Sequence, residues 1–144
     1  TRTDMAAFTA RTEETLANLM KQRTVLNVRR KRRRALYTAL ADAEALAPVK
    51  ELYEAGLSGM ETEFAQYMDA VAALEQCGVP REGLIQEKAE LYDRLAELNR
   101  QIRAERRKLA LCRKTQNSLP RMEQEIDKAE ARESEVRTNE HRRR

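Results

Sequence analysis

The sequence predicts an all-α protein, and its composition gives two reasons. Charged residues make up 36 % of the 144 residues, and the hydrophobic 41 % is mostly alanine and leucine. Aromatic residues reach only 4 %, while four glycines and three prolines leave few turns for the sandwiches, barrels or doubly wound sheets that need them. Apolar residues at helical spacing in this background indicate long helices. We expect an elongated helical hairpin or a three- to four-helix bundle, in a single domain over 1–144.

The first predicted helix is long and covers about 4–47. Thr3 and Asp4 place a capping residue and an acid at its start. Pro48 should end it near Ala47, because a residue before proline avoids the helical region. Its apolar face recurs at helical intervals on both sides of a basic run and consists of Met5, Phe8, Leu16, Leu19 and Leu26, then Leu36, Leu40, Ala43 and Ala47.

Two short helices are predicted within about 49–76. A break at Gly56–Gly59 separates them, and Ser58 with Glu61 has the spacing of a capping box. The second helix should stop at Cys77–Gly78, because glycine is a C-terminal signal and Pro80 follows.

The strongest pattern predicts a long helix over about 81–118, coiled-coil-like from about 84–117. Steps of four and three residues define a seam, seven of whose nine positions are apolar: Leu84, Lys88, Leu91, Leu95, Leu98, Ile102, Glu105, Leu109 and Cys112. Such a seam needs a partner along its length. The first helix folded back and a second copy of the chain are the two candidates.

Pro120 interrupts the pattern near the C-terminal end. It either kinks the long helix or lies in the first turn of a new helix capped by Ser118. We expect a separate helix over about 120–138, because a further apolar pattern follows in a different phase: Met122, Ile126, Ala129 and Val136.

The net charge of +4 conceals an uneven distribution of charge. Residues 1–47 hold ten cations against five anions, residues 48–99 four against eleven, and residues 100–144 fourteen against eight. The chain therefore has two basic ends and an acidic middle, and the basic ends favour a polyanionic partner.

The most informative feature is a run of six cations at 29–34. Successive helix residues rotate by about 100°, so six of them surround the helix and cannot share one solvated face. Like charges four residues apart also cost about 0.2–0.5 kcal/mol per pair. Phosphates offer such cations counterion release and two-pronged hydrogen bonds to arginine. The predicted nucleic-acid-binding residues are Arg29, Arg30, Lys31, Arg32, Arg33 and Arg34, followed by Arg103, Arg106, Arg107, Lys108, Arg113 and Lys114. Alternatively, these charges pair with the acidic middle and are simply solvated.

Other chemistry has little support in the sequence. His141 is the only histidine, and with Cys77 and Cys112 it makes no recognisable metal-ligand spacing. We predict no catalytic residue, no metal and no cofactor. Cys112 falls on the seam as a small buried residue, and Tyr37 either packs its ring on the seam with a solvated hydroxyl or stacks on a base.

Several expectations concern the setting of the protein. Two widely separated cysteines favour reduced thiols and a cytoplasmic location, with no signal peptide and no membrane partner. Because the chain opens on Thr1, we expect a fragment of a longer protein or a processed terminus.

The C-terminal half resembles the helical tails of relaxases, the mobilisation nucleases of Gram-positive conjugative and mobilisable elements. The resemblance rests on the cadence of leucines, arginines and cysteine in Glu87–Tyr92, Leu95–Asn99, Ile102–Arg103 and Leu109–Arg113, and on the closing Asn139–Arg144. It covers about 80–144. The nuclease itself requires a histidine cluster that is missing here, so the resemblance implies an accessory, relaxase-associated role in conjugation or mobilisation.

Together these observations predict a non-enzymatic, helical nucleic-acid-binding domain, with DNA as the expected ligand. Its contacts would position the phosphate backbone rather than read the base sequence. The alternative is a coiled-coil module that forms a homodimer or scaffolds protein partners through the helical seam.

Overall fold

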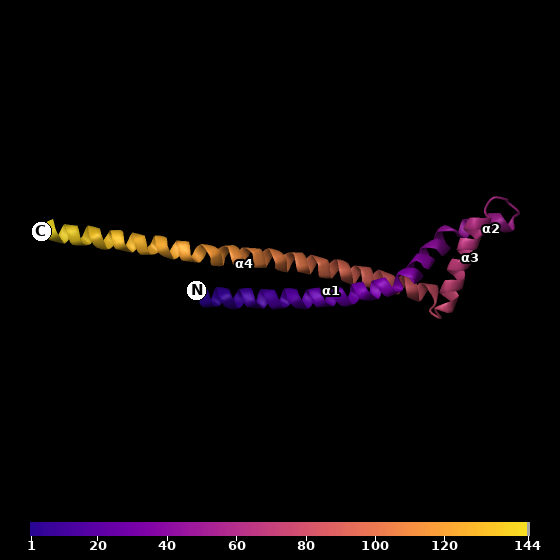
Figure 1. Ribbon diagram of the computed structural model, residues 1–144, viewed down its shortest axis with the longest axis horizontal. Coiled ribbons are helices and arrows are strands. Elements are labelled where there is room, and N and C mark those ends of the chain that lie inside the picture. Colours follow the sequence, from indigo (N-terminus) through magenta and orange to yellow (C-terminus); the bar gives the residue numbers. More distant parts are fainter. Residues whose placement is uncertain (144) are drawn as a thin grey trace. The chain divides into compact units, whose positions relative to one another are not determined.

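The computed structural model describes the backbone of residues 1–143 and the side chains of residues 1–140. Four α-helices follow one another along the chain, and no strand occurs among these residues (Figure 1). The predicted all-α class is confirmed. The helices are α1 (Arg2–Ala45), α2 (Ala47–Glu54), α3 (Glu61–Gln76) and α4 (Arg81–Arg143).

The chain divides into two compact units, whereas the sequence predicts a single domain. Unit 1 comprises Thr1–Met20 with Arg100–Arg144, and unit 2 comprises Lys21–Asn99. The division arises because α1 and α4 are both too long for one compact core. Each helix therefore contributes one stretch of residues to each unit.

Unit 2 holds the larger core, where α1, α3 and α4 meet. Its buried residues come from α1 (Tyr37, Ala39, Leu40, Ala43), α3 (Ala70, Leu74) and α4 (Leu84, Leu91, Leu95). The Tyr53 ring of α2 stacks on the Phe64 ring of α3, with centroids 4.1 Å apart. The unit thus folds the acidic middle of the chain back onto the basic part of α1.

Unit 1 is a slimmer pairing of two helices, the first part of α1 and the middle of α4 (Figure 1). Ile102, Leu109 and Cys112 are buried on α4. On α1 the buried residues are Thr9 and Thr12, whose hydroxyls donate to the carbonyls of Met5 and Phe8 within the same helix. These internal hydrogen bonds satisfy the hydroxyls and leave the threonine methyl groups to pack.

The seam predicted on α4 is confirmed at every apolar position. Leu84, Leu91, Leu95, Leu98, Ile102, Leu109 and Cys112 are all buried, with Leu84 and Leu98 fully inaccessible. The two polar positions, Lys88 and Glu105, are half-buried. The first of the two candidate partners is present in both units, because α1 lies along α4 in each of them.

Most of the apolar face predicted for α1 is confirmed. Leu40 and Ala43 are buried, and the half-buried residues are Met5, Leu16, Leu19, Leu26 and Leu36. One stripe of partly or fully buried residues on α1 follows steps of four and three through polar as well as apolar side chains: Met5, Thr9, Thr12, Leu16, Leu19, Arg23, Leu26, Arg30, Arg33, Tyr37 and Leu40. Phe8, predicted for the apolar face, is 44 % exposed. An apolar criterion finds only part of this stripe, because threonine and arginine occupy five of its eleven positions.

Two helix boundaries need correction. The first helix ends at Ala45 rather than Ala47, and Pro48 lies in the first turn of α2, where its missing N–H costs nothing. The capping box at Ser58 does not form, because α3 begins at Glu61 after Met60 and the Glu61 carboxylate accepts from the Gly59 N–H. The predicted stop after α3 is confirmed, since Gly78 has a φ of 71°, which glycine adopts without strain.

The predicted break at Pro120 is wrong, because α4 continues through it as one helix to Arg143. Proline removes the hydrogen bond to the carbonyl four residues earlier and crowds that turn. Here the ring is on the exposed surface, and the hydroxyls of Thr115 and Ser118 donate to the carbonyls of Leu111 and Thr115. The separate helix expected over about 120–138 is therefore the last part of α4.

None of the described helices combines the length and the apolar character needed to cross a membrane.

Candidate nucleic-acid interface

The basic run at 29–34 lies in unit 2, in the middle of α1. All six residues are helical, so their side chains surround the helix as the spacing predicts. Arg30 and Arg33 are half-buried on the stripe that faces α4, whereas Arg29, Lys31, Arg32 and Arg34 are exposed. The run is therefore partly an element of the α1–α4 contact and partly an open cationic surface.

One carboxylate, that of Glu87 on α4, engages one side of the run. The Arg33 Nε atom lies 3.1 Å from Glu87 Oε1, and an Arg29 terminal nitrogen lies 3.5 Å from the same oxygen. The Glu87 side chain is only 18 % exposed, so this shared contact is shielded from water better than an ordinary surface ion pair. Part of the alternative interpretation is thus correct, since the acidic middle neutralises one of the six charges.

Tyr37 lies beside this contact and is 4 % exposed. Its ring packs in the core, as predicted, but its hydroxyl is not solvated: Tyr37 Oη is buried and has no hydrogen-bond partner among the described residues. Burial raises the pKa of this phenol, the Glu87 carboxylate raises it further, and Arg33 and Arg29 oppose the rise. A buried ring cannot stack on a base, so the stacking interpretation of Tyr37 is wrong.

The next side of the run faces a cavity between α1 and α4. Its volume is about 430 Å³, and its lining contains three cations, two tyrosines and two small residues: Arg30, Arg34, Lys88, Tyr37, Tyr92, Thr38 and Ala41. The Lys88 ammonium lies 5.8 Å from the Tyr37 ring centroid and 5.9 Å from that of Tyr92. Both distances fall within cation–π range, so the two rings hold the ammonium at the cavity.

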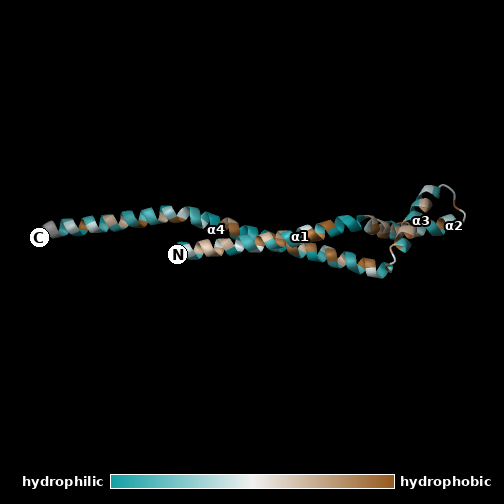
Figure 2. Ribbon diagram, turned by 60° about the horizontal axis from the view of Figure 1, so that its bottom comes forward, coloured by the Kyte–Doolittle hydropathy of each residue, from teal (hydrophilic) through white to brown (hydrophobic). Residues whose placement is uncertain are grey.

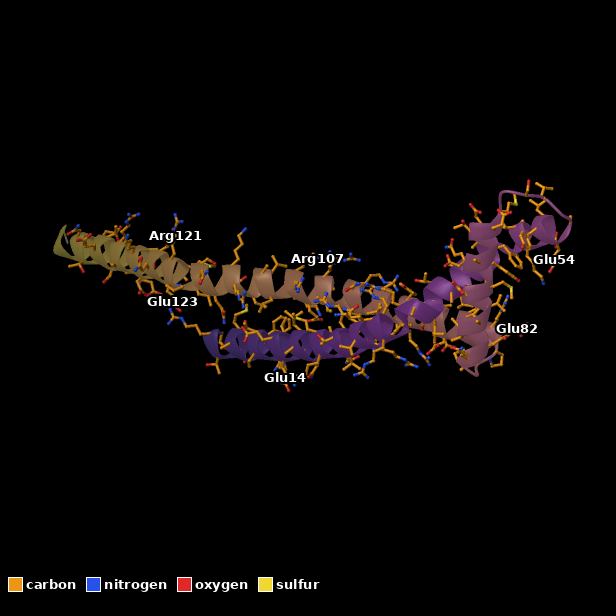
Figure 3. All side chains as sticks on the ribbon, turned by 45° about the vertical axis from the view of Figure 1, so that its right-hand side comes forward. Glu14, Glu54, Glu82, Arg107, Arg121 and Glu123 are labelled. Carbon is orange, nitrogen blue, oxygen red and sulfur yellow. The ribbon has the colours of Figure 1, made fainter. Side chains whose placement is uncertain are left out.

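The second predicted cluster lies on α4 in unit 1, and all six of its members are exposed. Lys108 contacts Glu105 at 3.0 Å, and Arg113 lies 3.9 Å from Glu13 on α1. Figure 3 shows the Arg107 side chain on the side of α4 turned away from the first part of α1. Arg103, Arg106, Arg107 and Lys114 form no ion pair within the described part of the chain.

The structure sorts the predicted residues into four groups. Arg29 and Arg33 meet on Glu87, Arg30 and Arg34 line the cavity, and Lys31 and Arg32 point to solvent. The cluster at 103–114 belongs to the other unit and is a separate surface.

Sequence reasoning missed Glu87, Lys88 and Tyr92 as neighbours of the basic run. A signal was available at Lys88, because a lysine at a seam position must either displace an apolar partner or meet aromatic faces. Glu87 and Tyr92 carry no comparable signal, since acids and tyrosines on a charged helix are usually solvated.

The remaining candidates are the two cysteines and His141. Cys112 is buried on the seam, as predicted, and the Cys77 thiol lies 3.0 Å from the Leu74 carbonyl oxygen. No group of three or more potential metal ligands occurs within the described residues, and the side chain of His141 lies outside them.

Comparison of the chain with protein-family models, with curated proteins and with solved structures finds no match in any of the three.

Proposed function

We propose that the protein is a non-enzymatic nucleic-acid-binding helical domain, with DNA as the expected ligand, and that the run at 29–34 supplies the main phosphate contacts. The supporting observation is the imbalance of charge around the run. Among the described residues, Glu87 is the one carboxylate that forms ion pairs with the run, so a single negative charge faces six positive ones. Uncompensated cations on a helix surface bind phosphates through counterion release.

The side chains that carry this proposal are Lys31 and Arg32. Both are exposed, and neither forms an ion pair with a described residue. Their substitution therefore changes surface charge without disturbing the α1–α4 contact. The exposed cluster at 103–114 gives a second surface of the same chemistry in unit 1.

Fluorescence anisotropy with labelled single-stranded and duplex DNA tests the proposal. If six or more phosphates are engaged, affinity should fall roughly a thousandfold between about 50 and about 200 mM salt. The double variant Lys31→Gln/Arg32→Gln should bind more weakly and with a shallower salt dependence, by about one unit of slope per lost phosphate contact.

The matched control is Arg132→Gln/Arg137→Gln, which removes the same charge from exposed positions outside both clusters. Equal weakening by both double variants would mean that only total charge matters, and it would contradict a site at the run. Absence of binding at low salt would refute the function itself.

The place of this activity in the cell is a further part of the proposal. The resemblance to relaxase tails supports an accessory role in conjugation or mobilisation, in a cytoplasmic setting. Binding to single strands in preference to duplexes would favour that role, because a relaxase releases one strand at the transfer origin.

A second candidate function, self-association through the end of α4, has its own observation. Met122, Ile126 and Val136 recur at heptad spacing with Ala129 and are 51 %, 57 % and 56 % exposed. Figure 2 shows the C-terminal stretch of α4 as mostly hydrophilic, with a few apolar bands along it. Sedimentation equilibrium tests this candidate: an oligomer that dissociates in Ile126→Asp supports it, and a monomer at all concentrations refutes it.

A further inference from the structure

The cavity between α1 and α4 in unit 2 has the chemistry of an anion site. Three of its seven lining residues are cationic, and none is a carboxylate. Arg30 and Arg34 lie one helical turn apart on α1, so their guanidinium groups project from the same face. Lys88 reaches the same cavity from α4. Three cations converge here from two helices.

The local carboxylate is engaged elsewhere. Glu87 accepts from Arg29 and Arg33, whose face of α1 lies about 100° around the helix from that of Arg30 and Arg34. The two arginine pairs of the run therefore differ in kind. One pair has a protein anion as its partner, and the other borders a cavity without one.

The rings of Tyr37 and Tyr92 flank the Lys88 ammonium, with centroids at 5.8 and 5.9 Å, and favour its position at the cavity. Tyr37 is anchored in the core of unit 2, so at least one wall is rigid. A positioned ammonium loses less side-chain entropy on binding an anion than a freely moving surface lysine does. Ala41 leaves room in the cavity, and the Thr38 hydroxyl is a further donor at its edge.

We propose that this cavity binds one phosphate group, held by Arg30, Arg34 and Lys88. The inference rests on the proposed function in one respect, because that function makes a nucleic acid the source of the phosphate. It goes beyond that function by assigning the phosphate to a discrete pocket. Three converging cations match the dianion of a terminal phosphomonoester better than a singly charged phosphodiester. The pocket should therefore prefer the phosphorylated end of a strand, or a free phosphate, over an internal linkage.

The first experiment compares two single-stranded oligonucleotides that differ only in a 5′-phosphate or a 5′-hydroxyl. The full chain should bind the phosphorylated strand about tenfold more tightly, the factor that one charge-assisted hydrogen bond supplies. Arg30→Gln/Arg34→Gln and Lys88→Gln should each abolish that preference. The control Lys31→Gln/Arg32→Gln lowers overall affinity by removing the same charge from the same run, and it should keep the preference.

A second experiment separates this inference from the proposed function. Inorganic phosphate at about 10 mM, tenfold above a Kd of about 1 mM, is added while NMR follows the arginine Nε–Hε signals. Signals of Arg30 and Arg34 should shift, while that of Arg32 stays in place. Such shifts with no DNA binding would support the pocket with a free phosphate as its source and would refute the proposed function.

Two results would overturn the pocket. The first is that the parent chain shows no preference for the 5′-phosphate, or that the preference falls equally in Arg30→Gln/Arg34→Gln and in the control Lys31→Gln/Arg32→Gln. The other is a phosphate titration that shifts all arginine signals alike or shifts none. DNA binding that survives either result would leave the proposed function intact.

Discussion

At the scale of single residues, the candidate site depends on whether each charged group has an ion-pair partner and each hydroxyl a hydrogen-bond partner. Tyr37 illustrates the cost of incomplete compensation. Its ring contributes to the core, yet its buried hydroxyl has no partner among the described residues. A buried polar group without a hydrogen bond costs about 1–3 kcal/mol. The neutral phenol is also favoured there, because burial and Glu87 raise its pKa above the ordinary 10.0.

Tyr37→Phe should therefore stabilise the protein by about 1 kcal/mol at neutral pH, since the ring is kept and the orphan hydroxyl is removed. The raised pKa also has a consequence in alkali. The unfolded phenol ionises near pH 10 and the folded one only at higher pH. The contribution of the neutral Tyr37 phenol to the free energy of unfolding is therefore fully present below pH 10, and it decreases as the pH rises above 10.

Urea unfolding between about pH 8 and about pH 11 measures both effects. The fall in stability above pH 10 should be shallower in Tyr37→Phe than in the parent chain. A destabilised variant at neutral pH would show that the hydroxyl has a partner in solution.

Glu87 is the second residue whose role can be isolated. Glu87→Gln should destabilise unit 2 by about 1 kcal/mol, because Arg29 and Arg33 lose a partly shielded partner. The same change should strengthen polyanion binding, because the run gains one uncompensated charge. Thermal unfolding and DNA anisotropy measure the two opposite effects.

The control for that variant is Asp93→Asn, which removes the same charge from an exposed position on α4. It should leave stability unchanged and alter DNA affinity less. If both variants strengthened binding equally, the effect would belong to total charge and not to the run.

At the scale of elements, α4 is held by a narrow seam. Ile102 is 1 % exposed, while Leu111 on the same helix is 65 % exposed. Hydrophobic stabilisation follows buried area, so the two positions should respond very differently to the same loss of side chain.

Ile102→Ala should destabilise the protein by about 2–5 kcal/mol, and Leu111→Ala by no more than about 0.5 kcal/mol. Both residues belong to unit 1, so the comparison is made within one core. Chemical denaturation followed by circular dichroism gives both values. Similar losses at the two positions would mean that the α1–α4 contact of unit 1 does not form as described.

At the scale of the whole molecule, the clustered positive charge should oppose stability and, on the proposed function, favour DNA binding. The basic run concentrates six like charges within two turns of helix. Most ion pairs between described residues have at least one exposed partner and are individually weak. Salt screens such interactions over about 10 Å at 0.1 M. Repulsion within the run should therefore outweigh the ion pairs in the salt response.

Without DNA, the midpoint of thermal unfolding should rise as salt increases from about 50 to about 500 mM, because like charges are screened. DNA affinity should fall over the same range. The rise in midpoint should be smaller in Lys31→Gln/Arg32→Gln. A midpoint that falls with salt would show that ion pairs, and not repulsion, dominate the chain.

The all-α class, the α4 seam and the helical basic run followed from the sequence, because helix spacing and charge are local properties. The seven apolar seam positions needed only their intervals to be recognised as buried. What depended on tertiary structure was everything at which two distant segments meet. The stripe of α1 is recognisable only once α4 shows which face is covered, since arginine and threonine occupy part of it.

The same reason explains the site. Composition identified the six cations, but whether an arginine meets Glu87, borders a cavity or faces water depends on α4, more than fifty residues away in sequence. The break predicted at Pro120 is wrong for a related reason. Whether a proline breaks a helix or is tolerated within it depends on what surrounds its ring. Local chemistry determined the elements of this protein and the charge that they carry, while packing between α1 and α4 decided which of those charges remain available to a ligand.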